Sequence, residues 1–262
     1  MSADIIRKTC REIMKSLVPA ERWAANEAFA SELKEMIASH RVATHKAWSL
    51  LDAGKMDINV MRRAHLEFRH AFAQNFSEWL LNLMVSARDL EPTQGALGKS
   101  TARCLIVLNV LDELGFEGES ADPRKGHYVA FDKVLRELGL SEEEVNNHVP
   151  FDSTKAARRV VESAYGDHAA LAVTVAVGES LFTRIAGPWA RNMSKNSNID
   201  TTTGYHAIHV EHDGHFLDDD HADDVWFVFC QAVEPARYDE MRGKVAEVLE
   251  SWAKMADSFV AD

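Results

Sequence analysis

Long stretches of this chain carry apolar side chains at spacings of three and four residues, with few helix-breaking residues between them. The clearest is 58–87, where Phe68, Phe72, Phe76, Trp79 and Leu83 follow one another at such intervals. This spacing puts the apolar side chains on one face of an α-helix. Only 6 prolines and 13 glycines interrupt the 262 residues, and strand-like alternation is nearly absent. We therefore expect an all-α helical bundle.

Capping signals divide this helical pattern into elements. Asp57 is placed to cap the helix that begins at Ile58, and Ser141 with Glu144 has the pattern of a capping box. Gly115 and Gly139 mark helix ends. The resulting prediction is one domain, 1–262, of about eight to ten helices. They cover 2–17, 20–54, 58–87, 101–114, 127–139, a short helix after Ser141, 152–166, 169–185, 225–232 and 235–259, with loops at 91–100, 116–126 and 192–203.

Charge and composition exclude some classes of function. The formal net charge is −12, which disfavours a nucleic-acid partner because phosphate contacts need a basic patch. The three cysteines, Cys10, Cys104 and Cys230, have no CxxC spacing and are expected to be free thiols in a reducing compartment. Neither a signal peptide nor an apolar run of about 18 residues is evident. We expect a cytoplasmic protein that binds no membrane; its oligomeric state stays open, with a homodimer as one option.

Histidines and acids are concentrated in the segment Tyr205–Asp224, YHAIHVEHDGHFLDDDHADD. It holds five of the chain's 12 histidines: His206, His209, His212, His215 and His221. Imidazole and carboxylate together are the mixed ligand set that iron, manganese and zinc accept. His209 and Asp213 are four residues apart, so on a helix both would point the same way. For most of the aspartates, a solvated acidic face is the simpler interpretation.

Three further residues are candidate ligands because of where they stand. Glu179 lies in the apolar segment ALAVTVAVGESLF, where a carboxylate facing the core needs a partner or a metal. An exposed position, or a pair with Arg184, is the structural alternative. Glu113 ends an apolar helix, and a helix C-terminus disfavours acids. His127 begins the next helix and alone would be interpreted as a surface or capping residue.

Another cluster of similar residues, AHLEFRH, contains His65, Glu67 and His70. The arginines around it favour a solvated helix face over a binding site. We interpret the remaining histidines, including His206, as structural or surface residues.

Four segments together resemble the haem-oxygenase-like di-metal oxidases and oxygenases, a family related in fold to thiaminase II and pyrroloquinoline quinone synthase. They are NVLDELG, then His127 with a helix ending LRELGL, then VGES around Glu179, and last the motif that starts at His209. The likeness covers about residues 40–232. It implies that Glu113, His127, Glu179, His209 and Asp213 are metal ligands, with Asp112, Glu211 and His212 beside them.

The last motif departs from the family pattern. The family has a histidine where this chain has Phe216. Either a short insertion moves that ligand to His221, or a distorted turn presents His212 or His215. HADDVW resembles the family's sequence after its last ligand, which favours His221.

The function implied by the resemblance is that of a non-haem di-iron enzyme that uses O₂. Its cofactor would be two Fe(II) ions, with manganese as an alternative. Its substrate would be a small molecule such as an amino acid or a fatty acid in a biosynthetic pathway, and the reaction N-oxygenation, desaturation or C–C cleavage. One alternative is a metal-independent enzyme of the same fold, thiaminase-like or a cofactor oxidase, with Cys104 or Cys230 as nucleophile. The other is a non-catalytic metal-binding protein.

Overall fold

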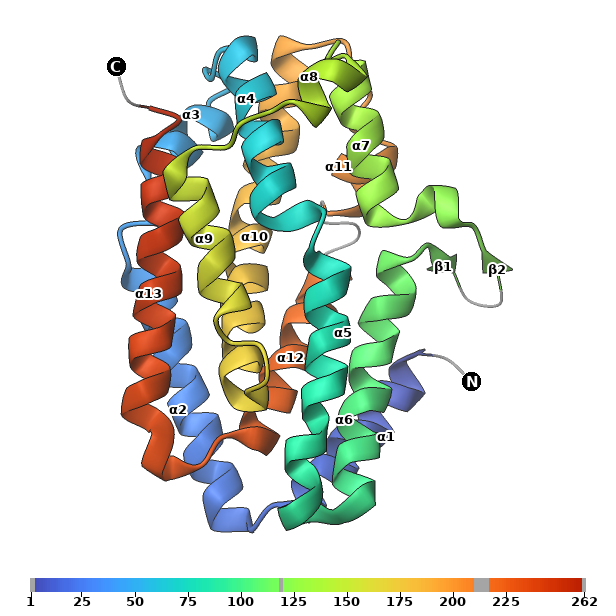
Figure 1. The fold of residues 1–262 in the computed structure, drawn as a ribbon, viewed down its shortest axis with the longest axis vertical. Coiled ribbons are helices and arrows are strands. Elements are labelled where there is room, and N and C mark those ends of the chain that lie inside the picture. The colour runs from blue at the N-terminus through green and yellow to red at the C-terminus, as the bar shows by residue number, and fades with distance from the viewer. Residues whose placement is uncertain (1–2, 118–119, 210–216, 261–262) are drawn as a thin grey trace.

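A computed structural model describes residues 3–117, 120–209 and 217–260 of the chain (Figure 1). These residues form an elongated bundle of helices, and ten of the α-helices are 11 residues or longer. The helices are α1 Ala3–Leu17, α2 Ala20–Ser39, α3 Lys46–Asp52, α4 Ile58–Phe68, α5 Phe76–Ser86, α6 Glu91–Glu113, α7 His127–Glu137, α8 Glu142–Asn146, α9 Asp152–Glu162, α10 His168–Asn196, α11 Gly204–Ile208, α12 Leu217–Ala232 and α13 Tyr238–Asp257.

Short elements join these helices. A π-helix, η1 Arg69–Ala73, connects α4 to the turn before α5, and 3₁₀ turns lie at Ala87–Leu90 (η2), Pro123–Lys125 (η3) and Pro235–Arg237 (η4). The strands of the described part, β1 Phe116–Glu117 and β2 Ser120–Ala121, pair antiparallel with Phe116 opposite Ala121. The predicted capping residues are confirmed, because Asp57 accepts from Asn59 N, and Ser141 and Glu144 form a reciprocal capping box.

Helix α10 is the centre of the bundle and packs against α3, α5, α12 and α13. Every residue from His168 to Glu179 is buried, and most of these side chains are small, which allows neighbouring helices to approach closely. By length and hydropathy α10 is also a candidate membrane span, contrary to the expectation of no such run. However, 83% of its apolar window is buried inside the bundle, as in the core helix of a globular protein.

The structure corrects several predicted boundaries. The predicted loop 91–100 is helical and belongs to α6, with Gly95 (φ 66°) making a kink within it. The predicted helix 20–54 is divided into α2 and α3. Helix α10 runs past Pro188 to Asn196, into the segment predicted to be a connection. The predicted helix 58–87 is interrupted by η1.

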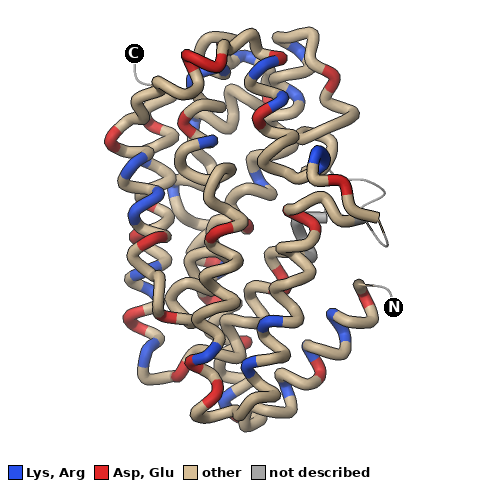
Figure 2. The backbone as a smooth tube through the Cα atoms, turned by 45° about the vertical axis from the view of Figure 1, so that its right-hand side comes forward, with Lys and Arg blue, Asp and Glu red and all other residues tan. Residues whose placement is uncertain are grey.

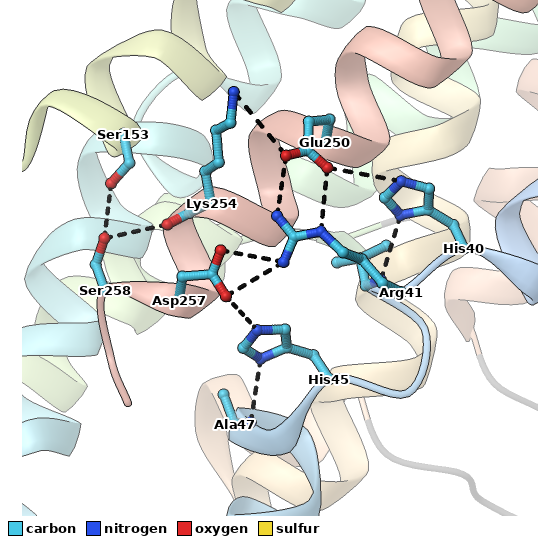
Figure 3. Close-up of polar contacts among 10 residues, drawn as sticks. His40, Arg41, His45, Ala47, Ser153, Glu250, Lys254, Asp257 and Ser258 are labelled. Carbon is cyan, nitrogen blue, oxygen red and sulfur yellow. Dashed lines mark hydrogen bonds and ion pairs between the residues drawn. The ribbon is translucent and has the colours of Figure 1, made fainter. Parts of the chain in front are cut away.

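The corner between α2 and α3 is fixed to α13 by charged groups (Figure 3). The Arg41 guanidinium contacts Glu250 and Asp257, each at 3.0 Å. The His45 ring accepts a hydrogen bond from Ala47 N at 3.2 Å, which caps α3, and its Nε2 lies 2.9 Å from Asp257 Oδ1. Elsewhere acidic and basic residues are interspersed along the helices (Figure 2).

Candidate metal centre

A small cavity inside the bundle brings together residues from five separate parts of the chain. Its volume is about 20 Å³, enough for a single water-sized species. Four of the lining residues were predicted as ligands: Glu113 at the end of α6, His127 at the start of α7, Glu179 in α10, and His209 just after α11. All four are buried, with 3 to 7% of each residue exposed.

Glu113 and His127 are in direct contact. Glu113 Oε1 lies 2.8 Å from His127 Nδ1, although 13 residues separate them in the sequence. The connecting loop folds back on itself, because β1 pairs with β2 and Asp122 N donates to Gly115 O at 3.0 Å.

Two glycines make this close return of the chain possible. A Cβ on Gly115 (φ 83°) would lie 2.4 Å from Asp122 O and 2.8 Å from Gly126 N. A Cβ on Gly126 would lie 3.1 Å from the Glu113 carbonyl oxygen. Only glycine fits the first position without displacing the loop, since it lacks a Cβ and accepts positive φ. The glycines therefore place His127 directly beside Glu113.

Asp112, next to Glu113, joins two of the candidate histidines. Its Oδ2 lies 3.1 Å from His221 Nε2 and 3.6 Å from His127 Nε2. Burial alone would raise the pKa of the Asp112 carboxyl, but the hydrogen bond to His221 and the nearby imidazoles outweigh it and lower that pKa. His221 is itself buried, near the start of α12, and Asn109 of α6 donates to its carbonyl oxygen at 3.4 Å.

Glu179 and His209 are the other two candidate ligands that line the cavity. Glu179 is 3% exposed and faces the bundle interior, so the alternative of a solvated glutamate is wrong. Its neighbour Gly178 lets η1 approach, because a Cβ there would lie 3.3 Å from the ring of Phe72. The ring of His209 is 5.0 Å from that of His127, between centroids, and 4.5 Å from that of Tyr205.

Apolar side chains, most of them aromatic, form the rest of the wall. Phe72 and Ala73 come from the π-helix η1, Phe76 from α5 and Phe182 from α10. Because a π-turn inserts one residue into a helix, it changes which side chains face inward, and such turns are frequent at functional sites. Tyr128 lies at the edge, where its hydroxyl accepts from Arg69 Nη2 at 2.7 Å.

Of the predicted pair His209 and Asp213, the structure describes only His209, which directly follows α11. Helix α11 ends at Ile208, and α12 begins at Leu217. Asp213, His212 and His215, along with Glu211, lie outside the described residues. Within the described residues, no group of three or more His, Cys, Asp or Glu side chains has the spacing of a metal-binding cluster. Four candidate ligands, Glu113, His127, Glu179 and His209, therefore line one cavity. Glu113 and His127 are also in direct contact.

Sequence reasoning missed the aromatic wall and misjudged one cluster. His65 and Glu67 are fully buried, so the predicted solvated face is wrong. Glu67 accepts from Arg63 at 2.7 Å and from Phe151 N at 3.0 Å, and lies 3.1 Å from His148. The segment before α9 folds over Glu67 and buries it. No local pattern in residues 65–70 indicates this burial. Phe182 and Phe72 gave only an apolar-helix signal, and Tyr205 was noted as the start of the histidine-rich segment and as a residue that could hold a carboxylate.

Comparison with known proteins supports the fold. No protein-family model and no curated sequence matches the chain. Among solved structures, a TenA homolog from Pseudomonas syringae pv. tomato matches with TM-score 0.63 and 13% identity, over 93% of this chain and 96% of that one. A CADD-like protein of unknown function from Nostoc punctiforme matches with TM-score 0.66 and 11% identity, over 91% and 100%. The predicted all-α, haem-oxygenase-like bundle is confirmed by these likenesses.

Proposed function

We propose that this chain is a non-haem, iron-dependent oxidoreductase that uses O₂ on a small organic molecule, with a di-iron site held by Glu113, His127, Glu179, His209 and His221 and completed by Asp213. The observation that carries the proposal is that two carboxylates and two imidazoles from distant segments line one small buried cavity. Acids and imidazoles gathered in an apolar interior need hydrogen bonds, ion pairs or a metal ion to offset the cost of burial, and a bound cation would serve all four side chains at once.

The described donor atoms fit one metal ion at this cavity. Two donors bound to one ion at about 2.1 Å each, at a right angle, would lie about 3.0 Å apart. Glu113 Oε1 and His127 Nδ1 are 2.8 Å apart, so this pair is already close to the spacing of two adjacent ligands. Metal-binding histidines usually hold a carboxylate with their second ring nitrogen. Asp112 has that relation to Nε2 of His127 and His221.

The remaining wall suits chemistry that must be kept from water. Bound iron would supply electrons and open coordination positions for O₂. Phe72, Phe76 and Phe182 exclude solvent from the carboxylates, and the size of the cavity admits only a small group beside them. Tyr205 packs against His209 and restricts its ring.

The metal-independent alternative has no comparable support. It would need a nucleophile at the cavity, and neither Cys104 nor Cys230 lines it. Burial raises the pKa of the Cys230 thiol to about 12, which suppresses the reactive thiolate.

The test is to load the purified protein with Fe(II) without oxygen, count the bound iron, and follow absorption and oxygen consumption after O₂ is added. We expect up to two ions per chain and an optical change on exposure to O₂. Glu179→Gln should reduce bound iron, whereas Glu35→Gln, at an exposed position on α2, should not. Absence of iron uptake would overturn the proposal. Tight iron binding without oxygen consumption would favour a non-catalytic metal-binding protein.

A further inference from the structure

A second and larger cleft lies beside the candidate metal centre. It has a volume of about 700 Å³, within the range of small-molecule pockets. One wall is α7 with the residues just before it, and the other is the segment 200–208, which includes α11. None of the predicted metal ligands lines it.

The outer part of this cleft is basic. Arg124, Lys133 and Arg136 line it, with side chains 88, 69 and 55% exposed. Lys125 adds a fourth cation, against two lining acids, Glu137 and Asp200. This balance is opposite to that of the whole chain, whose net charge is −12.

Two cations of this rim, Lys133 and Arg136, form ion pairs with neighbouring acids. Lys133 lies 3.4 Å from Glu137, and Arg136 lies 3.5 Å from Asp132. Exposed ion pairs of this kind contribute little to stability, so an incoming anion can take the place of the acid. The Asp200 carboxylate is already engaged, since it accepts from the hydroxyls of Thr202 and Thr203.

The inner part of the cleft is apolar and aromatic. Val134, Tyr205 and His206 line it and are only 4 to 5% exposed. His206 Nε2 makes no hydrogen bond to any residue that the structure describes. Tyr205 also lines the small cavity with Glu179 and His209, so one aromatic ring separates the two spaces.

We propose that this cleft binds the substrate, a small amphiphilic anion whose carboxylate or phosphate is held at the rim by Lys133 and Arg136. Its apolar part then lies over Val134, and its inner end reaches Tyr205. The inference rests on the proposed function only in making the bound molecule the substrate, because the binding itself does not need iron. The charged rim selects for the head group, and the buried floor selects for an apolar body.

The experiment measures binding calorimetrically, without iron or turnover, for three probes of equal chain length: octanoate, octyl phosphate and octan-1-ol. Both anions should bind more tightly than the alcohol, and added salt should weaken them. The double variant Lys133→Gln/Arg136→Gln should weaken the anions about tenfold and leave the alcohol unchanged. The matched control is Arg88→Gln/Lys254→Gln, which removes two cations that are 66 and 64% exposed elsewhere.

Comparison of octanoate with octyl phosphate identifies which head group the rim prefers. Equal binding of the alcohol and the anions, or anion affinity that the cleft variant does not change, would overturn the inference. Because no metal is present, such a failure is separate from failure of iron uptake. Conversely, head-group-dependent binding in a chain that takes up no iron would leave the cleft established and the oxidase proposal wrong.

Discussion

At the scale of single residues, the candidate site depends on charged side chains held in apolar surroundings. Glu179 could be predicted to face inward because a helix as apolar as α10 leaves little room for a solvated face. Glu113 and His127 were placed in one site only by the family resemblance, because each residue alone has a solvated or surface interpretation. Tyr205 and Phe182 could not be predicted, since which ring faces the cavity depends on the rotation of α10 and α11 in the packed bundle.

Asp112 supports a prediction at this scale. Asp112→Asn keeps the shape of the side chain but removes the charge that lies against Nε2 of His127 and His221. We expect Fe(II) affinity to fall about 10- to 100-fold, because such carboxylates orient metal-binding histidines and increase their basicity. Competition with a chromophoric chelator under anaerobic conditions measures the change. Asp89→Asn, at a partly exposed position whose nearest cation is 3.9 Å away, is the control. Equal affinities in the two variants would show that Asp112 has no role in holding the metal.

At the scale of elements, the π-helix η1 and the loop after α6 determine which side chains reach the cavity. The apolar spacing from Phe68 to Phe76 is the same as in an uninterrupted α-helix, so the sequence carries no signal for the extra residue in η1. The close packing of Phe72 against Gly178 of α10 belongs to the tertiary structure and accompanies that turn. The position of the loop after α6 could be predicted from the sequence. The close approach of Asp122 to Gly115 within that loop could not.

The role of the loop after α6 can be tested by comparing substitutions at two glycines that both have positive φ. Gly115 (φ 83°) has no space for a Cβ, whereas a Cβ on Gly166 (φ 86°) would have no neighbour within 4 Å. Gly166→Ala should therefore cost only the backbone strain, about 1 kcal/mol in the free energy of unfolding. Gly115→Ala should cost more, about 2 to 4 kcal/mol, because the loop must also open.

Only the change at Gly115 should affect the metal centre, since opening the loop moves His127 away from Glu113. Urea unfolding gives the two stabilities, and iron content after anaerobic loading gives the effect on the site. If Gly115→Ala retained the iron content of Gly166→Ala, the tight loop would not be what positions His127.

At the scale of the whole molecule, the bundle buries more histidines than its proposed metal centre uses. His65, His168 and His206 are 0 to 4% exposed and lie far apart in the sequence. His65 contacts Phe131, Trp189 and His206, and thereby joins α4 to α7, α10 and α11. His168 Nδ1 lies 3.0 Å from Ser86 Oγ, between α10 and α5. The sequence placed His65 on a solvated face and left His168 and His206 as structural or surface, because burial of a lone histidine depends on contacts that no local pattern contains.

Burial gives these histidines a common effect on stability. It lowers the pKa of His65 and His168 to about 4, and that of His206 to about 3. In the unfolded chain an ordinary histidine has a pKa near 6.5. Between these values the unfolded chain binds more protons than the folded one, so stability must fall as the pH decreases below 6.5. About one pH unit above 6.5, where the unfolded histidines are also neutral, the three residues no longer affect stability.

The expected loss between pH 7.5 and 5.5 is about 1.4 kcal/mol for each buried histidine, or about 4 kcal/mol for all three. Urea unfolding at the two pH values measures it, in a range where most carboxylates remain ionised. His168→Gln and His65→Phe should each reduce the pH-dependent loss by about a third, even if they also lower stability at pH 7.5. The comparison therefore separates proton binding from packing. A loss that stays the same in both variants would mean that other groups cause the acid sensitivity and that these imidazoles become protonated without unfolding the bundle.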